Sequence, residues 1–358
     1  MKKIMKLAIV MLSAFSFTAV QAGPLTVTGT AKASYVISSS DSATAKLESA
    51  KGLGVANEFN LGASGELDNG YTWKYNINID GGTTQDDGGL SLTTPYGSVA
   101  FNISQGGLEL SKSGAVSAFG SRPSDTGYGE GMYEEHSIGD MNNIGFATAA
   151  GMLPAGAVIK FSYAPGTTAD ADQSINAQGA ASPDTFIATT TVTADAQKAT
   201  MGNSMKSYQI KASPIDGLAV GASYSEFSGL AAKSQKPESG SIYAKYVTGP
   251  VTVAAGRAYI AHAVGAGNAD LIEDTENTKM SLGFAVNDAL SVSYNIDKST
   301  ANHQTTGTAD VELKSKMISA AYTMGGMTFA VAQVDHKNVG YVKDVDVNST
   351  VLNIAMAF

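Results

Sequence analysis

The chain has 358 residues, with no cysteine, 39 glycines and a formal charge of −9. Without cysteine, neither disulfides nor thiol chemistry can contribute to its stability or activity. Binding to nucleic-acid phosphates requires a basic surface, so the acidic balance excludes nucleic acid as a partner.

The first residues have the pattern of a secretion signal. A positive start leads into an apolar stretch and then a small residue: Lys2, Lys3 and Lys6, residues 7–20, and Ala22. The pattern predicts a signal peptide over residues 1–22 that is cleaved from the mature chain. Its apolar stretch is too short for a membrane-spanning helix, which takes about 20 residues. Removal of the three lysines brings the formal charge near −12.

The rest of the chain consists of short runs that alternate apolar and polar residues. Asp68-Asn69-Gly70 joins two such runs, and Asn-Gly in this position is the strongest local signal of a β-hairpin. Seven short turns and eight longer polar segments separate sixteen predicted strands, each of about 8–12 residues, long enough to cross an outer membrane when tilted. The alternation is least regular in residues 251–261 and 312–323, where Arg257 and Ser315 could face either way and a bulge could occur.

These strands favour a closed barrel over the other all-β folds. An open sheet would leave unpaired edges that are prohibitively costly in lipid. A β-sandwich of this length would normally divide into domains of about 100–150 residues, and a solenoid would show a fixed short repeat. We therefore predict one domain over residues 23–358: a 16-stranded antiparallel transmembrane β-barrel with short periplasmic turns and long external loops. At this strand number the interior is an aqueous channel.

The chain ends in a strand with Leu352, Ile354, Met356 and Phe358 on one face. A docked edge strand of a secreted β-sandwich could show the same pattern. With the signal peptide, the sixteen strands and a long third loop, this ending resembles the general porins of Gram-negative bacteria, in particular their shorter-looped alphaproteobacterial type. The resemblance implies a multi-pass outer-membrane homotrimer in contact with lipids and lipopolysaccharide. It also implies that Phe358 is part of the signal that the barrel-assembly machinery reads.

In that family the third external loop folds into the barrel and narrows the pore. The resemblance assigns this role to residues 105–141, which carry an excess of acids: Asp125, Glu130, Glu134, Glu135 and Asp140. A carboxylate-bearing loop across a narrow pore attracts cations and repels anions. The alternative is a solvated external loop, although a loop of this length is more often functional or disordered than idle.

Porins of this family face the acidic loop with basic residues, usually arginines, on the opposite wall. This chain departs from that pattern because it has only two arginines. The polar strand faces supply lysines instead, with the arginine less regularly placed: Lys32, Lys74, Lys160, Lys206 and Arg257. Ordinary lumen-facing lysines that keep the protein soluble would look the same. Because lysine lacks the planar fork of arginine, we expect a weaker transverse field.

The sequence contains no G-x-S-x-G, H-E-x-x-H or phosphate-loop motif, so it predicts no enzyme, no catalytic residue and no cofactor. Acidic pairs and clusters occur in predicted loops, at Asp86 with Asp87, Asp170 with Asp172, and Glu273 with Asp274 and Glu276. Their spacing fits no calcium-loop pattern, and solvated loop charge is sufficient to account for them. Loop-bound Ca²⁺ is left open.

The predicted function is the passive diffusion of small hydrophilic solutes and ions through a weakly cation-selective channel. One alternative is a substrate-specific channel, for example for sugar uptake, which would need an aromatic track in the lumen. The other is a non-transporting structural or adhesin barrel.

Overall fold

The computed structural model describes residues 21–40, 50–80, 87–103, 117–120, 122–123, 138, 142–165, 204–228, 235–261, 272–303 and 310–357. Seventeen strands are present in this part of the chain, together with two short 3₁₀ helices, η3 (Pro154–Gly156) and η4 (Val339–Tyr341). Among the same residues, no helix is long and apolar enough to cross a membrane.

The described strands follow one another around the sheet in the order of the chain. They are β1 (Gln21–Ala22), β2 (Thr26–Ser40), β3 (Ala50–Glu66), β4 (Thr72–Asp80), β5 (Asp87–Thr94), β6 (Gly97–Ile103), β7 (Asn143–Thr148), β8 (Val158–Ala164), β9 (Ser204–Ile215), β10 (Leu218–Ser228), β11 (Glu238–Thr248), β12 (Val251–Ala261), β13 (Ile272–Ala285), β14 (Leu290–His303), β15 (Val311–Met324), β16 (Met327–Lys337) and β17 (Val347–Ala357).

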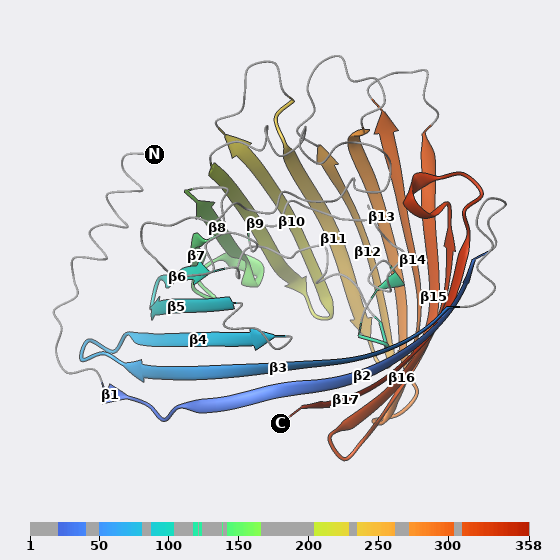
Figure 1. Ribbon diagram of the computed structural model, residues 1–358. Coiled ribbons are helices and arrows are strands. Elements are labelled where there is room, and N and C mark those ends of the chain that lie inside the picture. Colours follow the sequence, from blue (N-terminus) through green and yellow to red (C-terminus); the bar gives the residue numbers. More distant parts are fainter. Residues whose placement is uncertain are drawn as a thin grey trace.

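Strands β2 to β17 form a closed antiparallel ring, which confirms the predicted barrel. Each strand pairs with the next in sequence, β17 pairs with β2, and the β9–β10 pairing completes the circuit. Figure 1 shows β8 to β13 side by side on one wall and β2 to β4 on another, connected through β14 to β17. The seventeenth strand is the two-residue β1, which pairs with β3 beside the ring and lies within the predicted signal peptide.

The short turns join the strands at one end of the barrel. At the predicted Asn-Gly turn, the backbone N–H of Gly70 donates to the carbonyl of Leu67 at 2.8 Å, and Gly70 has φ of +79°. Glycine adopts that left-handed conformation without the steric cost that a side chain brings. At the β5–β6 turn a Cβ on Gly97 would lie 2.1 Å from the carbonyl oxygen of Ala147, so the close approach of β7 requires glycine there.

Along each strand, alternate side chains point to opposite sides of the barrel wall. In β17, Leu352, Ile354 and Met356 are 46–47% exposed, whereas Val351 and Asn353 are only 5–6% exposed. This is the alternation that the sequence predicts for the last strand; Phe358 itself lies outside the described residues. The large exposed apolar side chains form the face that meets lipid, and the opposite face lines the interior.

The two irregular regions of the sequence pair without interruption. Residues 251–261 and 311–324 form continuous ladders with both neighbouring strands, so the bulges considered there do not occur. The register shifts instead between Leu218 and Val220 and between Ile272 and Asp274. Mixed polarity in these regions reflects charged groups on the outer face, and it does not mark a break in pairing.

The barrel wall is uneven in height. Strands β4 to β8 have 6–9 residues, whereas β9 to β17 have 11–14 and the adjoining β2 and β3 have 15 and 17. The long strands exceed the predicted length because their last residues continue the ladder beyond the apolar band.

Candidate functional site

Described residues between β6 and β7 contact the inner face of the barrel on the wall opposite β6. In the ring of sixteen strands, β6 lies eight places from β14, on the opposite wall. Yet Phe119 packs with residues of β15, β16 and β17, and Ala118 donates its backbone N–H to Ser293 Oγ of β14 at 2.9 Å. The described residues 117–120 and 122–123 therefore lie against the inner face of the wall opposite β6; that the whole of residues 105–141 forms the constriction stays a prediction.

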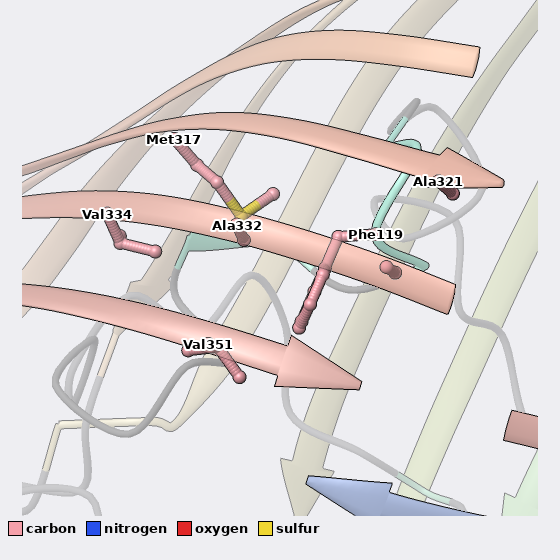
Figure 2. Packing of buried hydrophobic residues seen from close by; sticks show 7 residues of the cluster. Phe119, Met317, Ala321, Ala332, Val334 and Val351 are labelled. Carbon is pink, nitrogen blue, oxygen red and sulfur yellow. The ribbon is translucent and has the colours of Figure 1, made fainter. Parts of the chain in front are cut away.

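An aromatic side chain anchors the segment to the far wall. Phe119 is 7% exposed and lies against small and medium apolar side chains of the inner face, as Figure 2 shows for Met317, Ala321, Ala332, Val334 and Val351. These wall residues leave space for a ring because several of them are alanines. The Nζ of Lys32 lies 5.9 Å from the centre of the Phe119 ring, within the range of a cation–π interaction.

A buried ion pair fixes the same segment to β14. The Arg122 guanidinium donates from Nη2 to Asp297 Oδ1 at 2.8 Å and from Nε to Asp297 Oδ2 at 3.4 Å. Arg122 is 5% exposed and Asp297 is 1% exposed. The two-point geometry sets the orientation of the segment as well as its position. No local pattern in the sequence distinguishes Arg122 from an ordinary loop arginine.

The segment has a second contact close to its C-terminal end, on the wall formed by β8, β9 and β10. Ile138 is 1% exposed and packs with Ala164, Met205 and Phe227 on β8, β9 and β10. Asn143 at the start of β7 donates from Nδ2 to the carbonyl of Ile138 at 3.1 Å, and it accepts from Asn102 of β6 at 3.0 Å. The described parts of the segment therefore contact two well-separated walls of the ring.

The connection between β16 and β17, at the end of the barrel opposite the short turns, also contacts the inner wall. Tyr341 of η4 packs with Ile272 and Ala301, and its hydroxyl lies 2.6 Å from Ser299 Oγ. Burial raises the pKa of the Tyr341 phenol well above its ordinary value, so the hydroxyl stays protonated and can donate. Inward folding is thus not confined to the β6–β7 connection.

The predicted acidic residues of the constriction lie outside the described residues: Asp125, Glu130, Glu134, Glu135 and Asp140. Their assignment to the constriction stays a prediction, but the structure does describe residues near them in the sequence. Arg122 and Phe119 precede them on the β14–β17 wall, and Ile138 lies within their span on the β8–β10 wall.

Three of the five basic candidates are on the inner face. Lys32 faces the lumen beside Phe119. Lys74 alternates with the outward Trp73 and Tyr75, and Lys160 alternates with the outward Ile159 and Phe161. Whether these lysines face the acidic part of the segment stays a prediction.

The other two basic candidates are on the outer face, and the sequence prediction for them was wrong. Lys206 lies on the same face as Tyr208 and Ile210, 3.8 Å from Glu226. Arg257 lies on the same face as Val253, and its Nη2 donates to Glu276 Oε2 at 2.7 Å. Both were misassigned because polar residues near the ends of long strands lie beyond the apolar band, where polarity no longer indicates the lumen.

Sequence reasoning missed several other inner-face groups. Lys211, Lys245 and Lys279 share the inner face with Gln209, Ser241 and Ser281 respectively. The same alternation that placed Lys160 would have found Lys211 and Lys245. Ser315, which was left open, faces inward, with its Oγ 2.7 Å from His336 Nδ1.

In the described part of the chain, no group of three or more His, Asp or Glu side chains could hold a metal ion. This includes the cluster of Glu273, Asp274 and Glu276. Asp86, Asp170 and Asp172 lie outside the described residues.

The closed ring, the apolar outer face and the segment folded into a wide lumen define a membrane channel. The comparisons with known proteins agree. A family model described as Gram-negative porin matches residues 8–343, and the chain belongs to this family. It is thus a multi-pass outer-membrane protein that forms a channel for passive diffusion.

Solved structures with the same fold are distant in sequence. OmpF of Salmonella typhi, solved in complex with daunomycin, has 16% identity and a TM-score of 0.61, over 93% of this chain and 97% of that one. An anion-selective porin from Comamonas acidovorans has 12% identity and a TM-score of 0.62, over 94% and 100%. A mutant of the Rh. blastica porin has 10% identity and a TM-score of 0.53, over 94% and 100%. Comparison with curated protein sequences finds no match.

Replacement of Arg122 by Leu should destabilise the protein, because it removes the cation that makes a two-point contact with the buried Asp297 carboxylate. Breaking one partner of a buried pair costs about 3–5 kcal/mol, whereas removal of both charges costs much less. Urea unfolding in lipid vesicles should therefore show a large loss for R122L and a partial recovery for R122L/D297L.

Arg257→Leu is the matched control, because it removes the other arginine from an exposed pair worth about 0–1 kcal/mol. A loss in R122L no larger than in R257L would show that the buried pair does not hold the segment.

Proposed function

We propose that the channel is a general porin that passes small hydrophilic solutes and ions with weak cation preference, and that it does not act as an enzyme. The observation that supports a general channel is the distribution of aromatic residues. In the described strands, Phe227 and Tyr243 face inward, whereas the other aromatic side chains face outward. Phe227 is covered by Ile138. A sugar-specific channel would need an exposed aromatic track in the lumen, and two separated rings do not form one.

The cation preference rests on the acids of residues 105–141. The pair Arg122–Asp297 is internally neutral, so it leaves the sign of the constriction to the carboxylates that follow it. The lysines of the inner wall oppose them, which is why the expected preference is weak. The channel is also expected to lose the preference as salt rises, since the Debye length falls from about 10 Å at 0.1 M to about 3 Å at 1 M.

The joint replacement E130Q/E134Q/E135Q should abolish most of the cation preference while leaving single-channel conductance similar. The measurement is the reversal potential across a salt gradient in a planar bilayer. An anion-selective native channel, or a triple variant with unchanged reversal potential, would exclude these carboxylates from the constriction.

The channel is further proposed to assemble as a homotrimer through its short strands, β4 to β8. In the described residues, the outward positions of β4 to β8 carry no charged side chain; the large ones are Trp73, Tyr75, Ile77, Ile79, Leu90, Leu92, Val99, Phe101, Ile144, Phe146, Ile159, Phe161 and Tyr163. The outward positions of β9 to β16 do include charges near the external end. A face without charges along its whole height suits contact with other copies.

Deletion of Phe358 should lower trimer yield, because the assembly machinery is proposed to read the aromatic end of the last strand. The assay is heat-modifiable trimer in outer-membrane extracts, with Phe329→Leu on β16 as a control for loss of an outward aromatic. Normal trimer levels in the deletion variant would contradict the role of Phe358 in assembly.

The external end of β14 to β16 is proposed to contact lipopolysaccharide. Lys298, Lys314 and Lys337 lie directly opposite one another on these three strands, on the outer face. Like charges in that arrangement destabilise a sheet unless counter-charges are present. Glu312 lies 3.2 Å from Lys298 and Asp346 lies 2.7 Å from Lys337. The central lysine has no ion-pair partner among the described residues, and lipid phosphate would supply one.

The variant K298Q/K314Q/K337Q should therefore retain less lipopolysaccharide through detergent extraction and purification. Lys211→Gln, on the inner face, is the control. Equal amounts of bound lipopolysaccharide in both variants and the native protein would rule out this row as the contact.

A further inference from the structure

The inner face of β8 to β11 is divided into three zones along the pore axis. At the external end lies the apolar contact of Ile138 with Ala164, Met205 and Phe227. Below it lies a zone of buried hydroxyl groups, in which Ser207 pairs with Ser225, and Ser223 Oγ lies 2.6 Å from Ser241 Oγ. The zone nearest the short turns carries Lys160, Lys211 and Lys245, here called the lysine triad.

The register brings the triad together. Lys160 pairs with Gln209, so Lys211, two residues further on, is its diagonal neighbour on the same face. The Cβ atoms of such neighbours lie within about 7–8 Å. Lys211 pairs with Gly221, and Lys245 pairs with Ala219 on the same strand, so Lys245 is displaced from Lys211 by two strands and two residues, about 12 Å. Lys160 and Lys245 are three strands and four residues apart, about 20 Å, so an elongated anion such as a polyphosphate chain is needed to contact all three ammonium groups at the ends of their flexible stems.

The triad lies at the periplasmic end of the pore. Lys160 is the third residue of β8, which begins just after the β7–β8 turn. Lys211 and Lys245 lie four and three residues before the ends of β9 and β11. Short turns are on the periplasmic side of bacterial outer-membrane barrels. All three lysines therefore lie near the periplasmic ends of their strands.

No acid on the same wall neutralises the triad. Along the described inner positions of β8 to β11 the side chains other than the lysines are Ser, Ala, Gly, Gln, Met, Phe, Tyr and Val. The acid in the adjoining turn is Asp216, beyond the end of β9. Lys74 on β4 differs in this respect, because Glu66 is its diagonal neighbour on the inner face. Lys211 is exposed, and Lys160 and Lys245 are half-buried, so all three are accessible from the lumen.

We propose that the lysine triad is an anion site at the periplasmic mouth of the channel, which binds small molecules that carry several phosphate charges. A monovalent anion would exchange quickly through this field, whereas an anion with several charges can neutralise three lysines at once and block the pore. Because the triad lies within a few residues of the periplasmic turns, such an anion reaches the site over a shorter path from the periplasm than from outside. The proposal rests on channel function but not on its cation preference.

The test is one-sided block by inorganic tripolyphosphate in a planar bilayer at 0.1 M KCl, with channels inserted from one side. We expect half-block from the periplasmic side at a concentration at least ~10-fold lower than from the external side, with the difference lost at 1 M KCl as the Debye length falls to about 3 Å. K160Q/K211Q/K245Q removes the three positive charges and should weaken the periplasmic block about 10-fold. K160R/K211R/K245R keeps the charges at the same positions and should keep the block.

Lys206→Gln is the matched control, since it removes a lysine from the outer face of β9, the strand that carries Lys211. It should leave the block unchanged. Should the triple glutamine variant fail to insert, Lys211→Gln alone, at an exposed position, should still weaken the block measurably. Equal block from both sides, or a block that survives loss of the triad, would overturn the proposal. A native protein that conducts no current would instead contradict channel function, so the two failures are distinguishable.

Discussion

In the hydrocarbon of a membrane, every backbone N–H and C=O must find a partner within the protein, and this requirement controls the whole structure. A sheet satisfies it only when its first and last strands meet, as they do where β17 pairs with β2, from Val347 opposite Ser40 to Ala357 opposite Thr30. Once the ring is closed, alternate side chains face lipid or lumen. The chain therefore places apolar and polar residues in strict alternation over the apolar band.

Closure at sixteen strands has a second consequence, because the lumen becomes too wide for wall side chains to fill. Described residues of the segment between β6 and β7 occupy part of that space. Because the lumen contains water, the segment needs specific contacts with the wall to keep its position. Phe119 provides apolar contact, and the Arg122–Asp297 pair provides direction, on the wall opposite the origin of the segment. Ile138 provides the return contact. The described residues of the segment thus contact two separate walls of the ring.

Charge is distributed unevenly around this framework. The outer charges of β9 to β16 lie near the external end, where strands extend past the apolar band, and most are paired, as are Arg257 with Glu276 and Lys337 with Asp346. The inner wall carries lysines toward the periplasmic end and a buried, neutral pair nearer the constriction. A solute that crosses the channel therefore meets different potentials at its two ends, because ions in a water-filled lumen screen each zone over about 8–10 Å at physiological or lower salt.

The class of fold can be predicted from the sequence, because a period of two, sixteen predicted strands and alternating loop lengths fit few other folds. The sequence also identified the long third connection, the outward stripe of Leu352, Ile354 and Met356, and Lys32, Lys74 and Lys160 as inner-face lysines. These are local properties of a strand, so alternation alone is sufficient to find them.

Which polar residues share the lumen, and which long-range pairs form, follows from the three-dimensional structure and could not be predicted from the sequence. Lys206 and Arg257 look like lumenal residues along their own strands, but they lie on the outer face next to Glu226 and Glu276. Arg122 and Asp297 are 175 residues apart in sequence and meet across the barrel. No local pattern encodes such a contact, because it depends on the curvature of the closed sheet and on the path of a segment through its interior.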